Sequence, residues 1–260
     1  MATYLDKIVA HHRARASADT RSLTDLIREA ESLPVTRGFR DALALAGDQH
    51  LAVIAEIKRR SPSKGDLNPG LDPAELARVY ESCGASAMSV LTDGPHFGGS
   101  VDDLRTARNS CALPVIRKDF TVDLRDVCDA RIMGADCVLL IAAALSHDEI
   151  ARMHELALSI GLDVLVEIHD EKELELALAI GANLVGVNQR DLVTFAVDHE
   201  RAVRMAGQMP TGVVRVAESG VRDADDAVAL RRAGYHAVLV GETLVTSSDT
   251  CASLKSLLVA

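Results

Sequence analysis

The sequence predicts an α/β protein, a closed (β/α)8 TIM barrel with an N-terminal helical extension. Short apolar segments typical of buried strands alternate with amphipathic segments typical of helices, from about residue 47 onwards. A glycine, two small or polar residues and an apolar strand also recur at Gly84, Gly134, Gly181 and Gly234, at spacings of 50, 47 and 53 residues. Alternating strands and helices indicate a parallel sheet, and eight such units in roughly 210 residues fit a closed barrel.

Each of these glycines is expected where a helix ends, because the left-handed conformation there favours glycine. The strands that follow the glycines form one series, and a second series lies between them: Val53–Ile57, Pro114–Ile116, Val164–Val166 and Val213–Ala217. The predicted helices are Pro73–Ser82, Val101–Asn109, Leu124–Met133, His147–Ser159, Glu171–Ile180, His199–Gln208, Ala224–Ala233 and Thr250–Leu258. An open doubly wound sheet is the alternative, but the G-x-G-x-x-G pattern that it needs after the first strand is absent.

Residues 1–46 differ from the rest and are predicted to form a helical extension packed on the barrel, with residues 47–260 as the catalytic domain. A first helix is indicated by apolar residues with helical spacing, from Tyr4 to Val9. A second helix is expected over Thr24–Ser32, because Pro34 ends it. His11 and His12 are interpreted as part of a solvated helix face.

Composition excludes several classes of protein. The 260-residue chain has a formal charge of −10, with Asp and Glu spread evenly rather than in a tail, which argues against a nucleic-acid partner. No stretch approaches the roughly 20 apolar residues of a membrane span, and Met1–Ala10 lacks a secretory pattern, so we expect a cytoplasmic protein that does not bind membranes. The odd number of cysteines agrees with a reducing compartment, and all five are expected to be structural. No zinc-type spacing or H-E-x-x-H motif is present, so no metal is expected.

Polar residues follow the predicted strands where each one ends. Because parallel strands of a barrel open at one mouth, these side chains should surround a single pocket. Charges gathered in this way are costly unless they pair or meet a ligand, and an anionic ligand with a carbonyl or hydroxyl group would suit them. The residues are Glu56, Lys58, Thr92, Lys118, Asp119, Glu167, Asn188, Arg190, Glu218, Ser219 and Gly241.

Five of these residues also have a structural interpretation. Lys58 and Lys118 could be exposed loop lysines, and Glu167 could be a structural partner of a lysine. Asn188 could cap a loop, and Arg190 could pair with a nearby acid.

Two further features point to a phosphorylated, planar ligand. Phe97 and Phe120 belong to the 3% of aromatic residues and lie beyond strand ends, where they could stack on a ring. Glu218-Ser219-Gly220 and Gly241-Glu242 follow the last two strands, and barrels often bind phosphate with backbone N–H groups of these loops.

The segment Ile54–Gly65 resembles the signature of the indole-3-glycerol phosphate synthase family. Further similar segments follow in order along nearly the whole chain. They are Leu5–Val9, Leu91–Thr92 with Phe97–Ser100, Arg117–Phe120, Val166–His169, Val187–Leu192, Ala217–Gly220 and Val240–Glu242. The loop Asp93–His96 departs from the family pattern, which is more acidic there.

The resemblance implies ring closure, decarboxylation and dehydration of 1-(2-carboxyphenylamino)-1-deoxyribulose 5-phosphate to indole-3-glycerol phosphate, in tryptophan biosynthesis. It implies no cofactor or metal, and we expect a monomer. Two other hypotheses remain at this point. One is another phosphate-binding barrel enzyme, such as an aminosugar-phosphate isomerase, because one fold hosts many activities. The other is a non-catalytic relative that binds phosphorylated ligands.

The resemblance also implies roles for individual residues. Lys118 would be the general acid of ring closure, Lys58 would lie near the anthranilate carboxylate and assist dehydration, and Glu167 would be the base. Glu56 and Asn188 would orient the lysines and the substrate hydroxyls. Substrate binding would involve Ser61, Phe97, Phe120, Arg190 and Glu218, and phosphate binding would involve Ser219, Gly220, Gly241 and Glu242.

Overall fold

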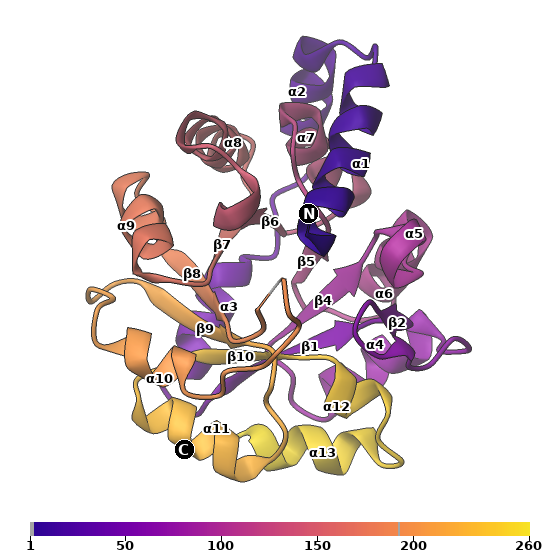
Figure 1. Cartoon of the computed structure of the whole chain (residues 1–260). Helices are drawn as coiled ribbons and strands as arrows, with labels where there is room; N and C mark the ends of the chain where they lie inside the picture. The colour runs from indigo at the N-terminus through magenta and orange to yellow at the C-terminus, as the bar shows by residue number, and fades with distance from the viewer. Residues whose placement is uncertain (1–2, 192) are drawn as a thin grey trace.

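The computed structural model contains a closed barrel of eight parallel strands (Figure 1). It describes residues 3–191 and 193–260, so Leu192, the last residue of one family-like segment, lies outside the described residues. The strands are hydrogen-bonded in the order β1, β10, β9, β8, β7, β6, β5, β4, and back to β1. Their bounds are β1 Ala52–Ile57, β4 Ala87–Leu91, β5 Val115–Lys118, β6 Cys137–Ile141, β7 Asp163–Ile168, β8 Leu184–Asn188, β9 Val214–Glu218 and β10 Ala237–Val240. The predicted barrel is confirmed.

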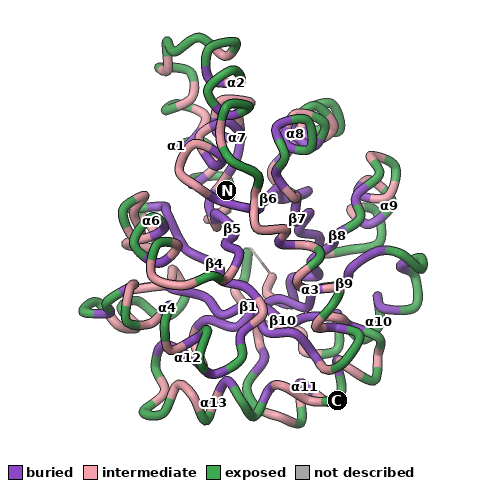
Figure 2. The backbone as a smooth tube through the Cα atoms, turned by 180° about the vertical axis from the view of Figure 1, so that it is seen from behind, coloured by how far each residue is buried: buried purple, intermediate pink, exposed green. Residues whose placement is uncertain are grey.

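The helices after the strands surround the barrel, and their inner faces are buried while their outer faces are exposed (Figure 2). The predicted glycines at positions 84, 134, 181 and 234 all have positive φ, between 80° and 98°. Every helix predicted in this region is present within two residues at each end. The helices are α4 Pro73–Ser82, α6 Val101–Ser110, α7 Leu124–Met133, α8 His147–Ser159, α9 Glu171–Ala179, α10 Arg201–Ala206, α11 Ala224–Arg232 and α13 Thr250–Leu257. Within residues 3–191 and 193–260, no helix is long and apolar enough to cross a membrane.

Several short elements were not predicted. The strands β2 Arg60–Ser61 and β3 Gly65–Asp66 pair as an antiparallel hairpin in the loop after β1. The helices α5 Gly94–Phe97 and α12 Glu242–Val245, each four residues long, lie in the loops after β4 and β10, and the 3-10 turn η1 Ala142–Ala144 follows β6. These elements are too short to produce a recognisable hydrophobic period.

A third N-terminal helix, α3 Phe39–Gly47, was also missed, and it completes the barrel core. Phe39 and Leu43 are fully buried in one cluster with inward residues of the strands, such as Ile54 and Ile116. Strand residues alternate between the inside of the barrel and its helical layer. The cluster therefore fills the lower interior of the barrel, and the polar strand ends lie beyond it.

The helices α1 Tyr4–Ala18 and α2 Leu23–Glu31 stand beside α7 (Figure 1). Arg15 on α1 pairs with Asp126 on α7 at 2.5 Å, and Arg21 pairs with Asp129 at 2.8 Å. The interpretation of His12 as a solvated residue is wrong, because His12 is only 2% exposed and faces the loops of the barrel mouth. His11 is exposed as expected. The division of the chain at residues 46 and 47 stays a prediction.

A disulfide joins Cys83 to Cys251, which the odd cysteine count did not predict. Closure of the barrel explains the pair, because β1 lies beside β10 and the helices that follow them, α4 and α13, are therefore neighbours. Cysteines separated by 168 positions thus come to a Cα–Cα distance of 5.3 Å. The thiols of Cys111, Cys128 and Cys137 are free.

Candidate active site

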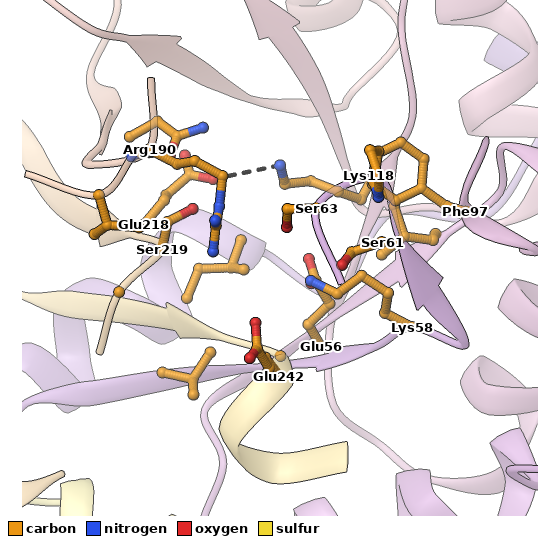
Figure 3. A pocket seen from close by; sticks show the side chains of 18 of the residues that line it. Glu56, Lys58, Ser61, Ser63, Phe97, Lys118, Arg190, Glu218, Ser219 and Glu242 are labelled. Atoms are coloured by element: carbon orange, nitrogen blue, oxygen red, sulfur yellow. Dashed lines mark hydrogen bonds and ion pairs between the residues drawn. The ribbon is translucent and has the colours of Figure 1, made fainter. Parts of the chain in front are cut away.

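A cavity of about 500 Å³ opens at the carboxyl ends of the strands. Of the residues expected at the mouth, Thr92 does not line this cavity, because it is buried and its hydroxyl donates a hydrogen bond to Asp119 Oδ2 at 2.5 Å. The fourteen residues that were given site roles all line it, although they come from strands and loops spread over nearly 190 positions of the chain (many of them are labelled in Figure 3). They are Glu56, Lys58, Ser61, Phe97, Lys118, Phe120, Glu167, Asn188, Arg190, Glu218, Ser219, Gly220, Gly241 and Glu242.

The strand pleat places the charged side chains inside the barrel. Ile54 and Ile116 point into the lower interior, and two positions later on each strand Glu56 and Lys118 point into the upper interior. Glu167, Asn188 and Glu218 occupy the corresponding positions of β7, β8 and β9. One apolar layer therefore supports a layer of charged and amide groups, which is the arrangement expected at the mouth of such a barrel.

Lys118 lies between two buried carboxylates. Its Nζ is 3.2 Å from Glu167 Oε2 and 3.4 Å from Glu218 Oε2. Burial alone would lower the pKa of Lys118, but the nearby carboxylates of Glu167, Glu218 and Glu56 outweigh burial and raise it. Lys118 is therefore a protonated ammonium that is held in place before any ligand arrives.

The two carboxylates beside Lys118 have different proton affinities. Burial tends to raise the pKa of Glu167, but Lys118, His169 and a 3.0 Å hydrogen bond donated by Asn188 Nδ2 lower it. Burial raises the pKa of Glu218, and the negative charges of neighbouring glutamates raise it further, against the effect of Lys118. Two carboxyl groups whose pKa values are pushed apart can take different roles in proton transfer.

His169 and Ser89 are polar neighbours that the sequence analysis did not assign to the site. His169 Nε2 lies 3.6 Å from Glu167 Oε1, and its Nδ1 lies 3.1 Å from Glu173 Oε2. The Ser89 hydroxyl donates a 3.1 Å hydrogen bond to Glu56 Oε2. The period-two alternation of β4 could have indicated an inward Ser89. His169 belongs to a quoted family-like segment and could have been found from it.

Lys58 forms a second cationic centre on the β1 side of the cavity. Its Nζ lies 2.5 Å from Glu56 Oε1, and both side chains point into the same pocket (Figure 3). Coulombic attraction to Lys58 and Lys118 lowers the pKa of Glu56, although burial opposes this shift and is the largest single effect. Glu56 is therefore ion-paired with Lys58 and is also influenced by the more distant charge of Lys118.

Glycine allows close approach at the end of the cavity formed by the last two strands. Ser219 and Gly220 both have positive φ, 65° and 75°, and a Cβ added to Gly220 would lie 2.5 Å from Val197 Cγ1. A Cβ added to Gly241 would lie 2.4 Å from Glu56 Oε1. Neither position has room for a side chain, so Gly220 and Gly241 line the cavity with backbone alone, which suits a phosphate site built from backbone N–H groups.

Aromatic and cationic groups occupy other parts of the wall. The rings of Phe97 and Phe120 are tilted by 37° with centroids 6.3 Å apart, and both line the cavity. The guanidinium of Arg190 donates to the carbonyl of Phe195 at 3.2 Å, and the Arg190 backbone N–H donates to Asn188 Oδ1 at 3.0 Å. The salt bridge that was the alternative role of Arg190 is not among the ion pairs of the described residues.

Comparison with known proteins agrees with this site. The model of the family "Indole-3-glycerol phosphate synthase" matches residues 5–257. The chain is 49% identical over 245 residues to indole-3-glycerol phosphate synthase 2 of Streptomyces coelicolor, covering 94% of this chain and 93% of that protein. It is 45% identical over 260 residues to the indole-3-glycerol phosphate synthase of Leptothrix cholodnii, covering 99% of both chains.

A solved structure shares the fold at low sequence identity. Thiamine phosphate pyrophosphorylase from Pyrococcus furiosus superposes with a TM-score of 0.59 at 18% identity, covering 82% of this chain and 95% of that one. This likeness supports the barrel alone. The family match over nearly the full length, together with the relatives at 45–49% identity, decides the function. The chain belongs to the indole-3-glycerol phosphate synthase family, the decarboxylating carbon–carbon lyases of tryptophan biosynthesis.

Proposed function

We propose that the fourteen predicted residues of this cavity bind 1-(2-carboxyphenylamino)-1-deoxyribulose 5-phosphate and close its indole ring, with the roles given below. The observation that carries the proposal is the protonated Lys118, held 3.2 Å and 3.4 Å from two buried carboxylates at the centre of the cavity. Around this centre lie the loops of Gly220 and Gly241, a pair of aromatic rings and a second lysine, which match the phosphate, the ring and the carboxylate of the substrate.

In the first step, the ring carbon that bears the carboxylate attacks the ribulose carbonyl carbon. The new carbon–carbon bond forms as the carbonyl π electrons move to oxygen, and Lys118 donates a proton to that oxygen. An ammonium suits this role because it supplies the proton and stabilises the negative charge that develops. The raised pKa of Lys118 supports the role, because it ensures that the group is charged before reaction.

In the second step, the carbon–carbon bond to the carboxylate breaks and its electron pair returns to the ring as CO2 leaves. Lys58 holds the carboxylate until then. In the third step the new hydroxyl group receives a proton and leaves as water. Lys58 assists this dehydration. Glu167 accepts the proton that the five-membered ring loses as it becomes aromatic. Its lowered pKa supports this role, because it keeps the carboxylate ionised.

The remaining residues position the substrate. Glu56 and Asn188 orient the two lysines, the base and the substrate hydroxyls, which agrees with their hydrogen bonds to Lys58 and Glu167. The anthranilate ring packs against Phe97 and Phe120. The polar groups of the substrate contact Ser61, Arg190 and Glu218. The phosphate is bound, chiefly through backbone N–H groups, by Ser219, Gly220, Gly241 and Glu242.

The experiment that tests this proposal is a fluorescence assay of indole formation with purified protein and the proposed substrate, in the presence of EDTA. The chain has no tryptophan, so the product signal has no indole background. Turnover in EDTA supports the proposed route, which uses no metal. Binding without turnover would refute the roles of Lys118 and Glu167. Because one chain supplies all the lining residues, we also propose that the active form is a monomer, which light scattering would test.

A further inference from the structure

Three potential metal ligands meet where the N-terminal helix α1 contacts the loop after β4. His12 comes from α1, and Asp93 and His96 come from the loop Asp93–His96, which departs from the family pattern. Asp93 Oδ2 lies 2.9 Å from His12 Nε2 and 2.9 Å from His96 Nδ1. The three ligand atoms all lie within 4.8 Å of one another.

The carboxylate between the two imidazoles is fixed in direction. Asp93 Oδ1 accepts hydrogen bonds from the backbone N–H groups of His96 and Phe97, at 2.6 Å and 3.2 Å. Its other oxygen, Oδ2, is therefore turned towards His12 and His96. His12 and Asp93 are each 2% exposed, and the side chain of His96 is 20% exposed, so the group is buried on one side and open to water on the other.

The hydrogen bonding of His12 leaves one of its nitrogens without a partner. Nε2 must carry a proton to donate to Asp93, so a neutral His12 has a bare, buried Nδ1. That atom has no hydrogen-bond partner among the described residues. A metal ion on Nε2 would replace the proton as the link to Asp93, and the proton of the neutral imidazole would then be on Nδ1, for which no described residue is an acceptor.

We propose that His12, Asp93 and His96 form a binding site for one divalent transition-metal ion of the zinc type. Two imidazoles and one carboxylate are a donor set that zinc prefers, with bonds of about 2.0–2.2 Å. Tetrahedral bonds of that length need ligand atoms about 3.3 Å apart. The two nitrogen–oxygen separations of 2.9 Å would have to open by only about 0.4 Å, and water at the exposed side of His96 would complete the coordination.

The ion would connect two parts of the chain that are far apart in sequence. His12 and Asp93 are separated by 81 positions, and Asp93 also lines the substrate cavity. His12 Nε2 is also 3.8 Å from Asp119 Oδ1, a second carboxylate that favours a cation at this place. A bound ion would fasten α1 to the rim of the cavity. The reaction steps proposed above do not use it, so the two proposals can fail independently.

The test uses the full chain without an affinity tag, stripped with EDTA and dialysed. Isothermal titration with Zn²⁺ should give one strong site per chain with a micromolar or tighter dissociation constant. Co²⁺ should give the visible absorption of a four-coordinate ion, and the melting temperature should rise with Zn²⁺ concentration. His96→Asn and His12→Asn should each weaken binding by at least about tenfold, because each removes a direct ligand.

His11→Asn is the matched control. The His11 ring lies 5.5 Å from that of His12 and 5.8 Å from that of His96, but His11 is exposed and does not belong to the ligand set. Its variant should bind Zn²⁺ like the natural chain. Absence of a one-to-one site, unchanged affinity in His96→Asn, or an equal loss in His11→Asn would overturn the proposal. His96 lies in a surface loop, so its variant decides the matter even if His12→Asn does not fold.

Discussion

Replacement of Lys118 by methionine is the sharpest test of the site. Methionine keeps much of the length of the side chain but removes the ammonium. At the separations of 3.2 Å and 3.4 Å, each carboxylate attracts the ammonium by about 5 kcal/mol with an effective dielectric constant of about 20. In Lys118→Met the carboxyl groups of Glu167 and Glu218 would face each other without a cation, and the pair would bind a proton. We expect the free energy of unfolding to fall by about 3–5 kcal/mol, the usual cost of removing one partner of a buried pair.

The effect on catalysis should be larger than the effect on binding. General acid catalysis contributes about 10²–10⁴-fold, and stabilisation of a developing oxyanion contributes about 10²–10³-fold. Lys118 is proposed to do both with a single group, so the two factors overlap rather than multiply. We expect kcat to fall by about 10⁴-fold, which corresponds to about 5.5 kcal/mol of barrier. KM should change by only a few-fold, because the phosphate and the ring are held elsewhere.

The assay is the indole fluorescence measurement, made alongside circular dichroism to show that the variant is folded. Lys172→Met is the control, because Lys172 is an exposed residue of α9, and its variant should keep full activity. A folded Lys118→Met enzyme with kcat within tenfold of the natural chain would refute the role of Lys118 as general acid.

The remaining predictions concern the base, the phosphate end and the disulfide. The pKa of Glu167 is lowered to about 2, so Glu167 should stay ionised, and the loss of its base function should lower the rate only as pH approaches about 2. Glu167→Gln should lower kcat at least about 100-fold, and an unchanged pH–rate profile in that variant would exclude Glu167 as the base. Gly220→Ala should raise KM at least about tenfold, because the φ angle of Gly220 is 75° and the new Cβ would clash with Val197. Gly207→Ala is the control, because its new Cβ would meet no atom within 4 Å, and it should leave KM unchanged. Reduction of the Cys83–Cys251 bond should lower the free energy of unfolding by up to about 5 kcal/mol for a loop of this length, and the melting temperature should fall with it. Cys83→Ser should abolish this dependence on reductant, and equal melting with and without reductant in the natural chain would contradict the prediction.

Most of the barrel could be predicted because its signals are local. The limits of a helix such as α4 follow from a capping aspartate, a proline in its first turn and a glycine just after its end. Strand ends are also local features, so Lys118 and Glu167 could be recognised as mouth residues from the apolar residues before them. The closed barrel then brings all such ends to one opening, and this geometry is why all fourteen predicted residues line one cavity.

Only the tertiary structure decided the contacts between segments that are far apart in the chain. The sequence contained no local sign that α3 would fill the end of the barrel with Phe39, or that closure would bring Cys83 to Cys251. His12 was assigned to a solvated face because it lies in the basic run His11–Arg15, but it is buried against Asp93, which lies 81 positions away. The proton affinities of Glu167 and Glu218 differ for the same reason. Residue type and strand position are written in the sequence, but burial and the distance to Lys118 arise only when the strands close into a barrel.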